Sequence, residues 1–315
     1  MKKILLVCDV KGWGGWNRAL YIKKHLSDEF EFTLVDNHGF IKTVDSGQFL
    51  EYDLIYLLFH TMLMKKRVKK LFAYKSNIVT IVTGFPTLKP CFDLIDEDTT
   101  IFNFRMLAER CRAIFANNIK SLRDLEKIKP SHLPTYYLPR GVDENIFYPE
   151  DVKRSDKFTV LYVGKPVPEK GLEEFIKPAC KQVGINLIIN DRNYTNALNE
   201  NQMRNLYNKA DCYIVASSID GTPNPALEAA ACGLPIISNE IGNMPEFIKH
   251  GKNGLLIKNS NKTIDKYVYA IKKLMSDREK CKEMGIEARK TILKSWTWKK
   301  VLENERLAFR EILNG

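Results

Sequence analysis

The stretch that decides the fold runs from Ser217 to Ile257 and reads SSIDGTPNPALEAAACGLPIISNEIGNMPEFIKHGKNGLLI. An apolar run at 211–216 precedes it, which is typical of a buried strand, and a turn rich in Gly and Pro then leads into a small-residue helix at 225–232. Pro225 suits the first helical turn, because its missing N–H would have no intrahelical partner there. The neighbouring free N–H groups and the helix dipole favour an anion, so the stretch predicts a phosphate site.

Two carboxylates flank this turn. Asp220 and Glu228 are eight positions apart, and on a strand, turn and helix both side chains can reach one bound molecule and accept hydrogen bonds from its hydroxyl groups. A phosphate site between two such carboxylates indicates a sugar phosphate as the ligand. The alternative is an ordinary strand, loop and helix in which the glycines serve the turns alone.

The order of motifs resembles the donor-binding signature of retaining GT-B glycosyltransferases, the large group 1 family that includes phosphatidylinositol mannosyltransferases and sucrose synthases. That signature is Glu-x7-Glu, a small-residue helix, Gly-x-Pro, and a Gly turn that ends in Glu. The counterparts here are 220–228, 233–235 and 242–246. Asp220 stands where the family has the first Glu. Its shorter side chain suggests a donor sugar that sits deeper or differs in stereochemistry or ring size.

A basic motif follows the strand expected at 158–163. The family has Gly-Arg and then Lys-Gly at this place, and this chain has Gly164-Lys165 and Lys170-Gly171. The resemblance implies that Lys165 and Lys170 hold the donor diphosphate and stabilise the charge that builds on it as the sugar leaves, without a metal. Lys165 keeps the charge of the usual Arg but not its bidentate geometry. Two surface lysines near a turn are the alternative.

The resemblance also assigns roles to the other site residues. It implies that Asp220 binds the donor sugar and that Glu228 binds the ribose hydroxyls. No metal ligand and no cofactor is expected, since the nucleotide-diphosphate sugar is itself a substrate. The further residues expected to contact the donor are Gly14, Gly15, Gly164, Gly221, Thr222, Pro223, Asn224, Pro225 and Ala226.

The first half of the chain repeats strand and helix. Apolar runs at 4–7, 32–35, 54–59, 78–82 and 113–116 alternate with helical or loop segments. This alternation predicts a parallel α/β sheet, with the last of these runs as its closing strand.

A histidine near the reacting carbon is usual in relatives, just after the strand expected at 78–82. This chain has Thr83 and Gly84 there, so that role cannot be carried over. His60 is the nearest candidate in this half for acceptor binding or proton handling. The alternative is a histidine with a purely structural role.

Aromatic and basic residues of the first half point to the acceptor. Trp13 and Trp16 lie beside the glycine pair, where their rings could stack on a sugar or a base, enter a lipid interface, or simply pack in the core. The segment 60–72 has apolar residues at helical spacing among basic ones. Such a helix can meet an anionic membrane or a nucleic acid, and its alternative is a solvated basic face.

Composition limits the class of protein. A length of 315 residues favours two domains, and 49 Lys and Arg against 38 Asp and Glu give a net charge of +11, which suits an anionic partner. The seven cysteines lack a Cys-x-x-Cys pattern, and the first apolar run is short and has no small-residue cleavage pattern after it, so we expect a reduced cytoplasm. No run is long enough to span a bilayer, so any contact with the inner membrane face would be peripheral.

The sequence therefore predicts an α/β protein of the GT-B class, with two Rossmann-like domains whose parallel sheets face a central cleft. The expected domains are an acceptor-binding one at 1–147, completed by a helix at 298–315, and a nucleotide-sugar-binding one at 148–297. The expected activity is retaining sugar transfer to a glycan, lipid-linked or nucleic-acid acceptor. A nucleotide-sugar epimerase and a non-catalytic nucleotide-sugar-binding protein are the alternatives. Nucleotide, sugar and oligomeric state stay open.

Overall fold

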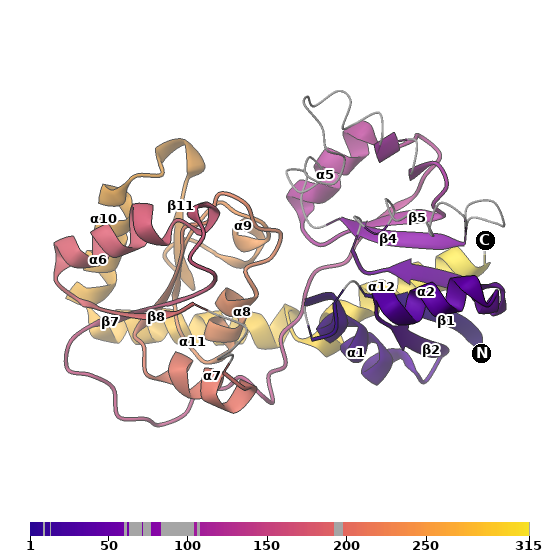
Figure 1. The fold of residues 1–315 in the computed structure, drawn as a ribbon. Helices are drawn as coiled ribbons and strands as arrows, with labels where there is room; N and C mark the ends of the chain where they lie inside the picture. Colours follow the sequence, from indigo (N-terminus) through magenta and orange to yellow (C-terminus); the bar gives the residue numbers. More distant parts are fainter. Residues whose placement is uncertain are drawn as a thin grey trace. The chain divides into compact units, whose positions relative to one another are not determined.

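The computed structural model describes residues 1–8, 10–12, 14–59, 62, 71, 77–82, 104–105, 108–191 and 198–314. These residues form two compact units (Figure 1). The first unit holds Met1–Arg140 and Val301–Gly315, and the second holds Gly141–Lys300. Among the described residues, no helix is both long and apolar enough to cross a membrane.

The first unit is built on a parallel sheet with strand order β2-β1-β3-β4-β5-β6. Its inner strands read as continuous apolar runs because helices cover both faces of such sheets. The strands are β1 (Lys2–Val7), β2 (Phe30–Val35), β3 (Leu54–Leu57), β4 (Ile78–Val82), β5 (Ala113–Ala116) and β6 (Thr135–Tyr137). The described helices of this unit are α1 (Gly14–Leu26), α2 (Asn37–Asp45), the short 3₁₀ helix at Gln48–Glu51, α5 (Ile119–Ile128) and most of α12 (Trp298–Asn314).

One sequence expectation about this sheet is wrong. The run at 113–116 was expected to close it, yet β6 pairs with β5 on its outer side. β6 has only three residues, all half-buried, so it lacks the apolar run that marks the other strands.

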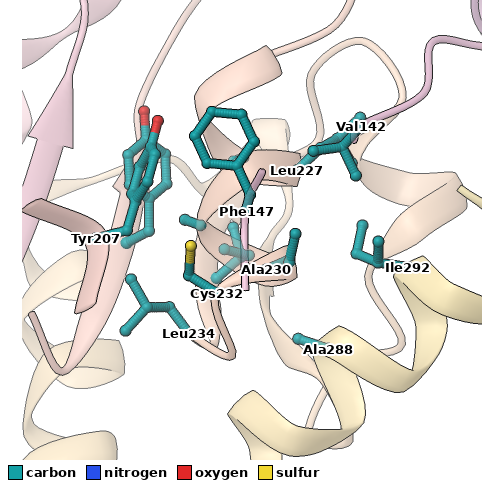
Figure 2. Packing of buried hydrophobic residues seen from close by; sticks show 14 of the residues in the cluster. Val142, Phe147, Tyr207, Leu227, Ala230, Cys232, Leu234, Ala288 and Ile292 are labelled. Carbon is teal, nitrogen blue, oxygen red and sulfur yellow. The ribbon is translucent and has the colours of Figure 1, made fainter. Parts of the chain in front are cut away.

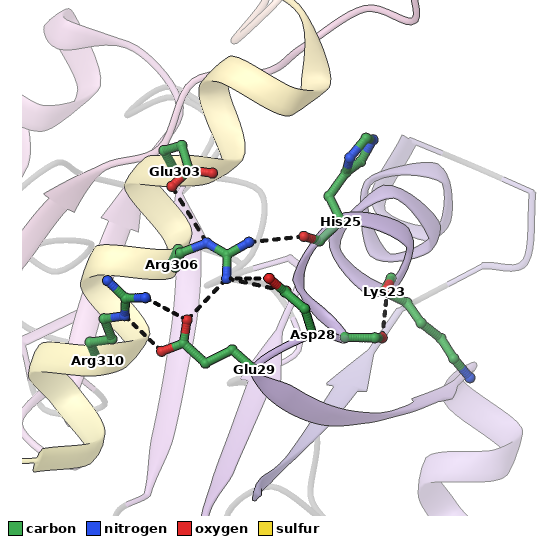
Figure 3. Close-up of polar contacts among 8 residues, drawn as sticks. Lys23, His25, Asp28, Glu29, Glu303, Arg306 and Arg310 are labelled. Carbon is green, nitrogen blue, oxygen red and sulfur yellow. Dashed lines mark hydrogen bonds and ion pairs between the residues drawn. The ribbon is translucent and has the colours of Figure 1, made fainter.

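Helix α12 completes the first unit on the side of α1 and β2. The ring of Phe309 packs against Phe30 and Tyr56, with centroid distances of 5.7 and 6.0 Å. Figure 3 shows the polar part of the same contact, where Arg306 and Arg310 of α12 bind Glu29 at 3.0 and 2.6 Å. These hydrogen bonds lower the pKa of Glu29 from 4.5 to about 2.

The second unit is built on a parallel sheet with strand order β11-β10-β9-β7-β8. Its strands are β7 (Thr159–Val163), β8 (Asn186–Asn190), β9 (Cys212–Val215), β10 (Ile236–Asn239) and β11 (Gly254–Ile257). Its helices are α6 (Lys177–Val183), α7 (Glu200–Asn208), α8 (Asn224–Ala231), α9 (Met244–Phe247), α10 (Ile264–Ser276) and α11 (Arg278–Ser295). Short helical turns at Pro168–Lys170, Leu172–Ile176 and Asn259–Asn261 complete it.

The core of the second unit depends on close packing of small residues. Figure 2 shows Leu227 and Ala230 of α8 facing Ala288 and Ile292 of α11. A methyl group on Gly285 of α11 would overlap the carbonyl oxygen of Gly233, just after α8, so only glycine fits there. Packing against α11 therefore fixes α8, and the N-terminus of α8 is held in place at the sheet edge.

The described cysteines have the core role that the sequence indicates. Cys8, Cys212 and Cys232 are at most 1% exposed, and all of the cysteines that the structure describes are free thiols. Burial raises the pKa of Cys111 to about 12, so this thiol stays protonated and behaves as a small apolar group.

Candidate active site

A cavity of about 210 Å³ opens in the second unit where β7 and β9 end and α8 begins. Ligands of open parallel sheets bind at this edge, beyond the carboxyl ends of the strands. The cavity combines strand ends, the glycine turn after β7 and the turn before α8. Its lining residues are Tyr162, Val163, Gly164, Lys170, Tyr213, Ile214, Val215, Ser217, Asp220, Thr222, Pro223, Asn224 and Pro225.

The structure brings Lys170 and Asp220 together in this cavity. Lys170 Nζ lies 2.5 Å from Asp220 Oδ2, and the two side chains are 30% and 17% exposed. Gly171 fixes the position of the lysine, because it has a φ of +66° and a Cβ there would overlap the carbonyl oxygen of Ala216. The loop after β7 is thus held against the end of β9. A cation and a carboxylate from two separate motifs line one small cavity.

Tyr162 supports the turn that carries Lys165. Its hydroxyl donates to the carbonyl oxygen of Lys165 at 2.9 Å, and the backbone N–H of Gly164 donates to Asn190 O at 3.0 Å. Burial, together with the negative charge of Asp220, raises the pKa of Tyr162 to about 12, so the hydroxyl remains a donor. Lys165 itself is exposed, and it is not part of the cavity lining.

The turn before α8 offers polar groups to a ligand. α8 begins after Pro223 without a side-chain cap, and Pro225 lies in its first turn as predicted. Thr222 Oγ1 and Asn224 Oδ1 are buried, and neither has a hydrogen-bond partner among the described residues. Buried polar atoms without partners are uncommon in folded proteins. A ligand that reaches this turn would satisfy them together with the helix N-terminus.

The two glycine turns of the opening stretch touch each other behind the cavity. Gly242 has a φ of +51°, and a Cβ on it would overlap the carbonyl oxygen of Gly221. Asn243 follows, fully buried, and neither side-chain amide atom has a hydrogen-bond partner among the described residues. The turn at 242–246 thus supports the backbone between Asp220 and Thr222 from outside the cavity.

Glu228 lies one helical turn further along α8, half-buried and outside the cavity lining. Tyr207 of α7 donates its hydroxyl hydrogen to Glu228 Oε2 at 2.6 Å. The sequence did not mark Tyr207 as a site residue, because it occupies an apolar position at helical spacing. Its ring does pack in the core, 5.9 Å from that of Phe147. A tyrosine at a buried helical position can therefore also orient a site carboxylate.

The predicted residues of the first unit fall into two groups. Gly14 and Gly15 begin α1, where Arg140 Nη1 donates to the carbonyl oxygen of Gly14 at 2.9 Å. Trp16 is half-buried, and Lys11 Nζ lies 5.7 Å from its ring centroid. Trp13, His60, Thr83, Gly84 and nearly all of the basic segment 60–72 lie outside the described residues.

Across the residues that the structure describes, no three His, Cys, Asp or Glu side chains are grouped so that they could hold a metal ion. The expectation of a site without a metal remains a prediction.

The structure of the chain is similar to solved structures of one fold class. One of them is sucrose-phosphate synthase from Thermosynechococcus elongatus, with a TM-score of 0.79, 14% sequence identity and 100% of both chains covered. Another is HepE from Anabaena in complex with UDP and glucose, with a TM-score of 0.74, 17% identity and 99% of both chains covered. The predicted α/β fold with two parallel Rossmann-like sheets is confirmed, and it is the GT-B fold.

Part of the second unit matches a known protein family. Residues 186–291 match the family described as glycosyl transferases group 1. The chain is 23% identical over 202 residues to a GDP-mannose-dependent alpha-(1-6)-phosphatidylinositol monomannoside mannosyltransferase of Mycobacterium tuberculosis, which covers 51% of this chain and 52% of the relative. The chain thus spans about half the length of the curated relatives it matches first.

Proposed function

We propose that this protein is a retaining glycosyltransferase whose second unit binds a nucleotide-diphosphate sugar. The observation that carries the proposal is the Lys170–Asp220 pair, which lines a cavity beside the unpartnered polar atoms at the start of α8. The match of residues 186–291 to the glycosyl transferases group 1 family supports the reaction class. The names of its relatives support the donor class, because one is GDP-mannose-dependent and one neighbour was solved with UDP and glucose.

The cavity suggests how the donor is held. The diphosphate would accept hydrogen bonds from Lys170 and from the free N–H groups at the start of α8, with Lys165 adding positive charge. The anion would then compete with Asp220 for Lys170, and the carboxylate, once displaced, could accept hydrogen bonds from the sugar hydroxyls. Donor binding therefore exchanges one ion pair for another, and it leaves neither charge buried alone.

Sugar transfer would need no covalent intermediate on the protein. The bond between the anomeric carbon and the diphosphate oxygen breaks as the acceptor hydroxyl attacks from the same face. The proton of that hydroxyl passes to the leaving diphosphate, whose growing negative charge is stabilised by Lys170 and Lys165. Because these cations can do the electrostatic work, we propose that the reaction is independent of a metal.

Glu228 would bind the ribose of the nucleotide. Its carboxylate oxygen Oε2 already accepts the hydrogen bond from Tyr207, which limits the orientations open to the carboxylate. We also propose that the first unit binds a glycan or lipid-linked acceptor in the cytoplasm, near the glycine pair at Gly14 and Gly15. His60 remains the candidate of that unit for acceptor binding or proton handling.

A donor screen tests the proposal. Each nucleotide sugar is added to the purified protein, and the melting temperature and the release of nucleoside diphosphate are measured. A true donor at about 100 times its Kd should stabilise the fold by about 2.7 kcal/mol. Lys170→Ala should lower turnover about 100-fold or more, as the loss of a preorganised charge-stabilising group does.

Lys177 provides the matched control. It forms an ion pair of the same length with Glu173, 2.5 Å, but that pair is on the surface and does not line the cavity. Lys177→Ala should therefore keep full turnover. Weak and equal responses to every donor, or unchanged transfer by Lys170→Ala, would refute the proposal. Donor binding without transfer to any acceptor would favour the non-catalytic binding protein, and conversion of the sugar itself would favour the epimerase.

A further inference from the structure

A second cavity of the second unit lies between the edge strand β11 and helix α10. It measures about 220 Å³ and shares no lining residue with the candidate active site. Its floor is apolar, since Leu255, Ile257 and Ala270 are each at most 8% exposed. Figure 1 shows α10 near one side of the second unit. β11 is the last strand of the sheet.

The rim of this cavity is basic. Lys258, Lys266 and Lys273 are exposed and line it, and none of them has an ion-pair partner among the described residues. Tyr269 lies between the last two lysines on the same face of α10, because positions i, i+3 and i+7 of a helix share one side. Tyr269 is 65% exposed. An apolar hollow is thus framed by three cations and one exposed aromatic ring, which we call the β11–α10 groove.

The segment that forms the groove is strongly basic in sequence. From Lys249 to Lys273 the sequence holds seven lysines and one acidic residue, Asp265. Two of the seven have partners elsewhere, because Lys252 pairs with Glu287 at 3.7 Å and Lys262 lies over the ring of Phe175. The three lysines of the rim therefore present their charge to solvent.

Protection of the sheet edge is the ordinary explanation for lysines at an edge strand. It does not account for two features of the groove. Lys266 and Lys273 come from α10 and not from the edge strand. Tyr269, moreover, adds exposed apolar surface beside the edge, whereas edge protection would remove such surface.

We propose that the β11–α10 groove docks the second unit on an anionic membrane surface. Phospholipid phosphates would contact the three lysines, and the ring of Tyr269 would lie at the headgroup level, where amphipathic aromatic side chains are enriched. The apolar floor would receive the upper part of an acyl chain. Nothing in this inference depends on sugar transfer.

A nucleic acid would also be attracted by three lysines, but the groove fits it less well. A strand of nucleic acid is bound along a track of cations, whereas these cations are grouped around one hollow of limited size. The floor is made of aliphatic side chains, which offer neither donors nor acceptors to base edges. The membrane is therefore the occupant that matches both the charge and the apolar floor.

Co-sedimentation of the full-length protein with vesicles tests this proposal. Vesicles of phosphatidylcholine alone are compared with vesicles that also contain phosphatidylserine, at low and at high salt. The variant Lys258→Gln/Lys266→Gln/Lys273→Gln should bind the anionic vesicles about 100-fold more weakly, since each lysine near such a surface contributes about fivefold. Tyr269→Ser should weaken binding by a smaller factor that salt does not change.

The matched control is Lys181→Gln/Lys280→Gln/Lys294→Gln, which removes the same charge from exposed positions elsewhere in the second unit. It should bind nearly as the unaltered protein does, and both triple variants should keep the parent melting temperature. Equal weakening by the two triple variants would reduce the effect to net charge and overturn the proposal. So would a rim variant that still binds vesicles but no longer retains double-stranded DNA.

Discussion

Two ion pairs of similar length lie in very different surroundings in the two units. In the first unit, Arg18 Nη2 and Glu305 Oε1 are 2.6 Å apart, and the side chains are 4% and 0% exposed. In the second unit, Lys170 and Asp220 are 2.5 Å apart, but they are partly exposed and line a cavity. The contact distance alone therefore does not distinguish a pair buried in the fold from a pair that lines a cavity.

The two ion pairs differ in their burial and in their other contacts. Arg18 also donates to the carbonyl oxygens of Leu138 and Pro139, so its guanidinium is enclosed by the fold. Burial raises the pKa of Glu305 to about 7, although the charge of Arg18 opposes this shift. The pair joins α1 to α12, and both of its side chains are buried. Lys170 and Asp220 can be reached by water, so they can separate at low cost and exchange partners with a bound anion.

The largest effect is expected from breaking the buried pair. Glu305→Leu should lower the free energy of unfolding by about 3–5 kcal/mol, because it leaves the charge of Arg18 buried without compensation. Denaturant unfolding measures this change. Arg18→Met combined with Glu305→Leu removes both charges and should restore most of the loss. If Glu305→Leu unfolds at the same denaturant concentration as the parent, the pair does not have the structural role inferred here.

Breaking the Lys170–Asp220 pair should affect sugar transfer much more than stability. Asp220→Asn keeps the shape of the side chain, and because the pair is partly exposed it should change stability by less than about 1 kcal/mol. The rate constant kcat/KM for sugar transfer should fall about 10- to 100-fold, which corresponds to the loss of a hydrogen bond made by a charged group. Denaturant unfolding and steady-state kinetics with the donor from the screen measure the two effects.

Asp220→Glu is the companion variant, since it restores the residue that the family usually has. If the short side chain selects the sugar, this variant should change the ranking of donors. A ranking that is unchanged in Asp220→Glu, together with full activity of Asp220→Asn, would show that this carboxylate does not contact the sugar.

The sequence predicts that Lys170 and Asp220 belong to one donor site, although not that they form an ion pair, and it gives no sign of the Arg18–Glu305 pair. This difference has a physical reason. Lys170 and Asp220 each follow a strand of one parallel sheet, and the carboxyl ends of such strands meet at one edge. Motif order is therefore enough to bring them together. Arg18 and Glu305 are 287 positions apart in two amphipathic helices, and no local pattern indicates that they meet.

Burial also decides which strands and which side-chain contacts can be predicted from the sequence. Long apolar runs such as β1 and β7 are visible in the sequence because they are buried on both faces. β6 is not visible, because three half-buried residues form no pattern. Tyr207 shows a further limit, since its apolar ring determines its periodicity while its hydroxyl determines its contact with Glu228. Side chains with two kinds of contact need the three-dimensional structure.

A third pair, on the surface of the first unit, extends the comparison to small effects. Arg310 and Glu29 are 50% and 28% exposed, and Arg306 binds the same carboxylate. Glu29→Gln should lower the free energy of unfolding near neutral pH by only about 0.5–1 kcal/mol. The contribution of Glu29 to stability should also depend on pH. Its pKa is about 2 in the folded state against an ordinary 4.5, so the contribution is fully present above pH 4.5 and is lost as the pH falls through the folded pKa.

The stability difference between parent and variant should therefore shrink from neutral pH to about pH 3. Melting curves at the two pH values measure it. A difference that stays constant would mean that the two arginines hold the glutamate through packing of their aliphatic chains and not through its charge.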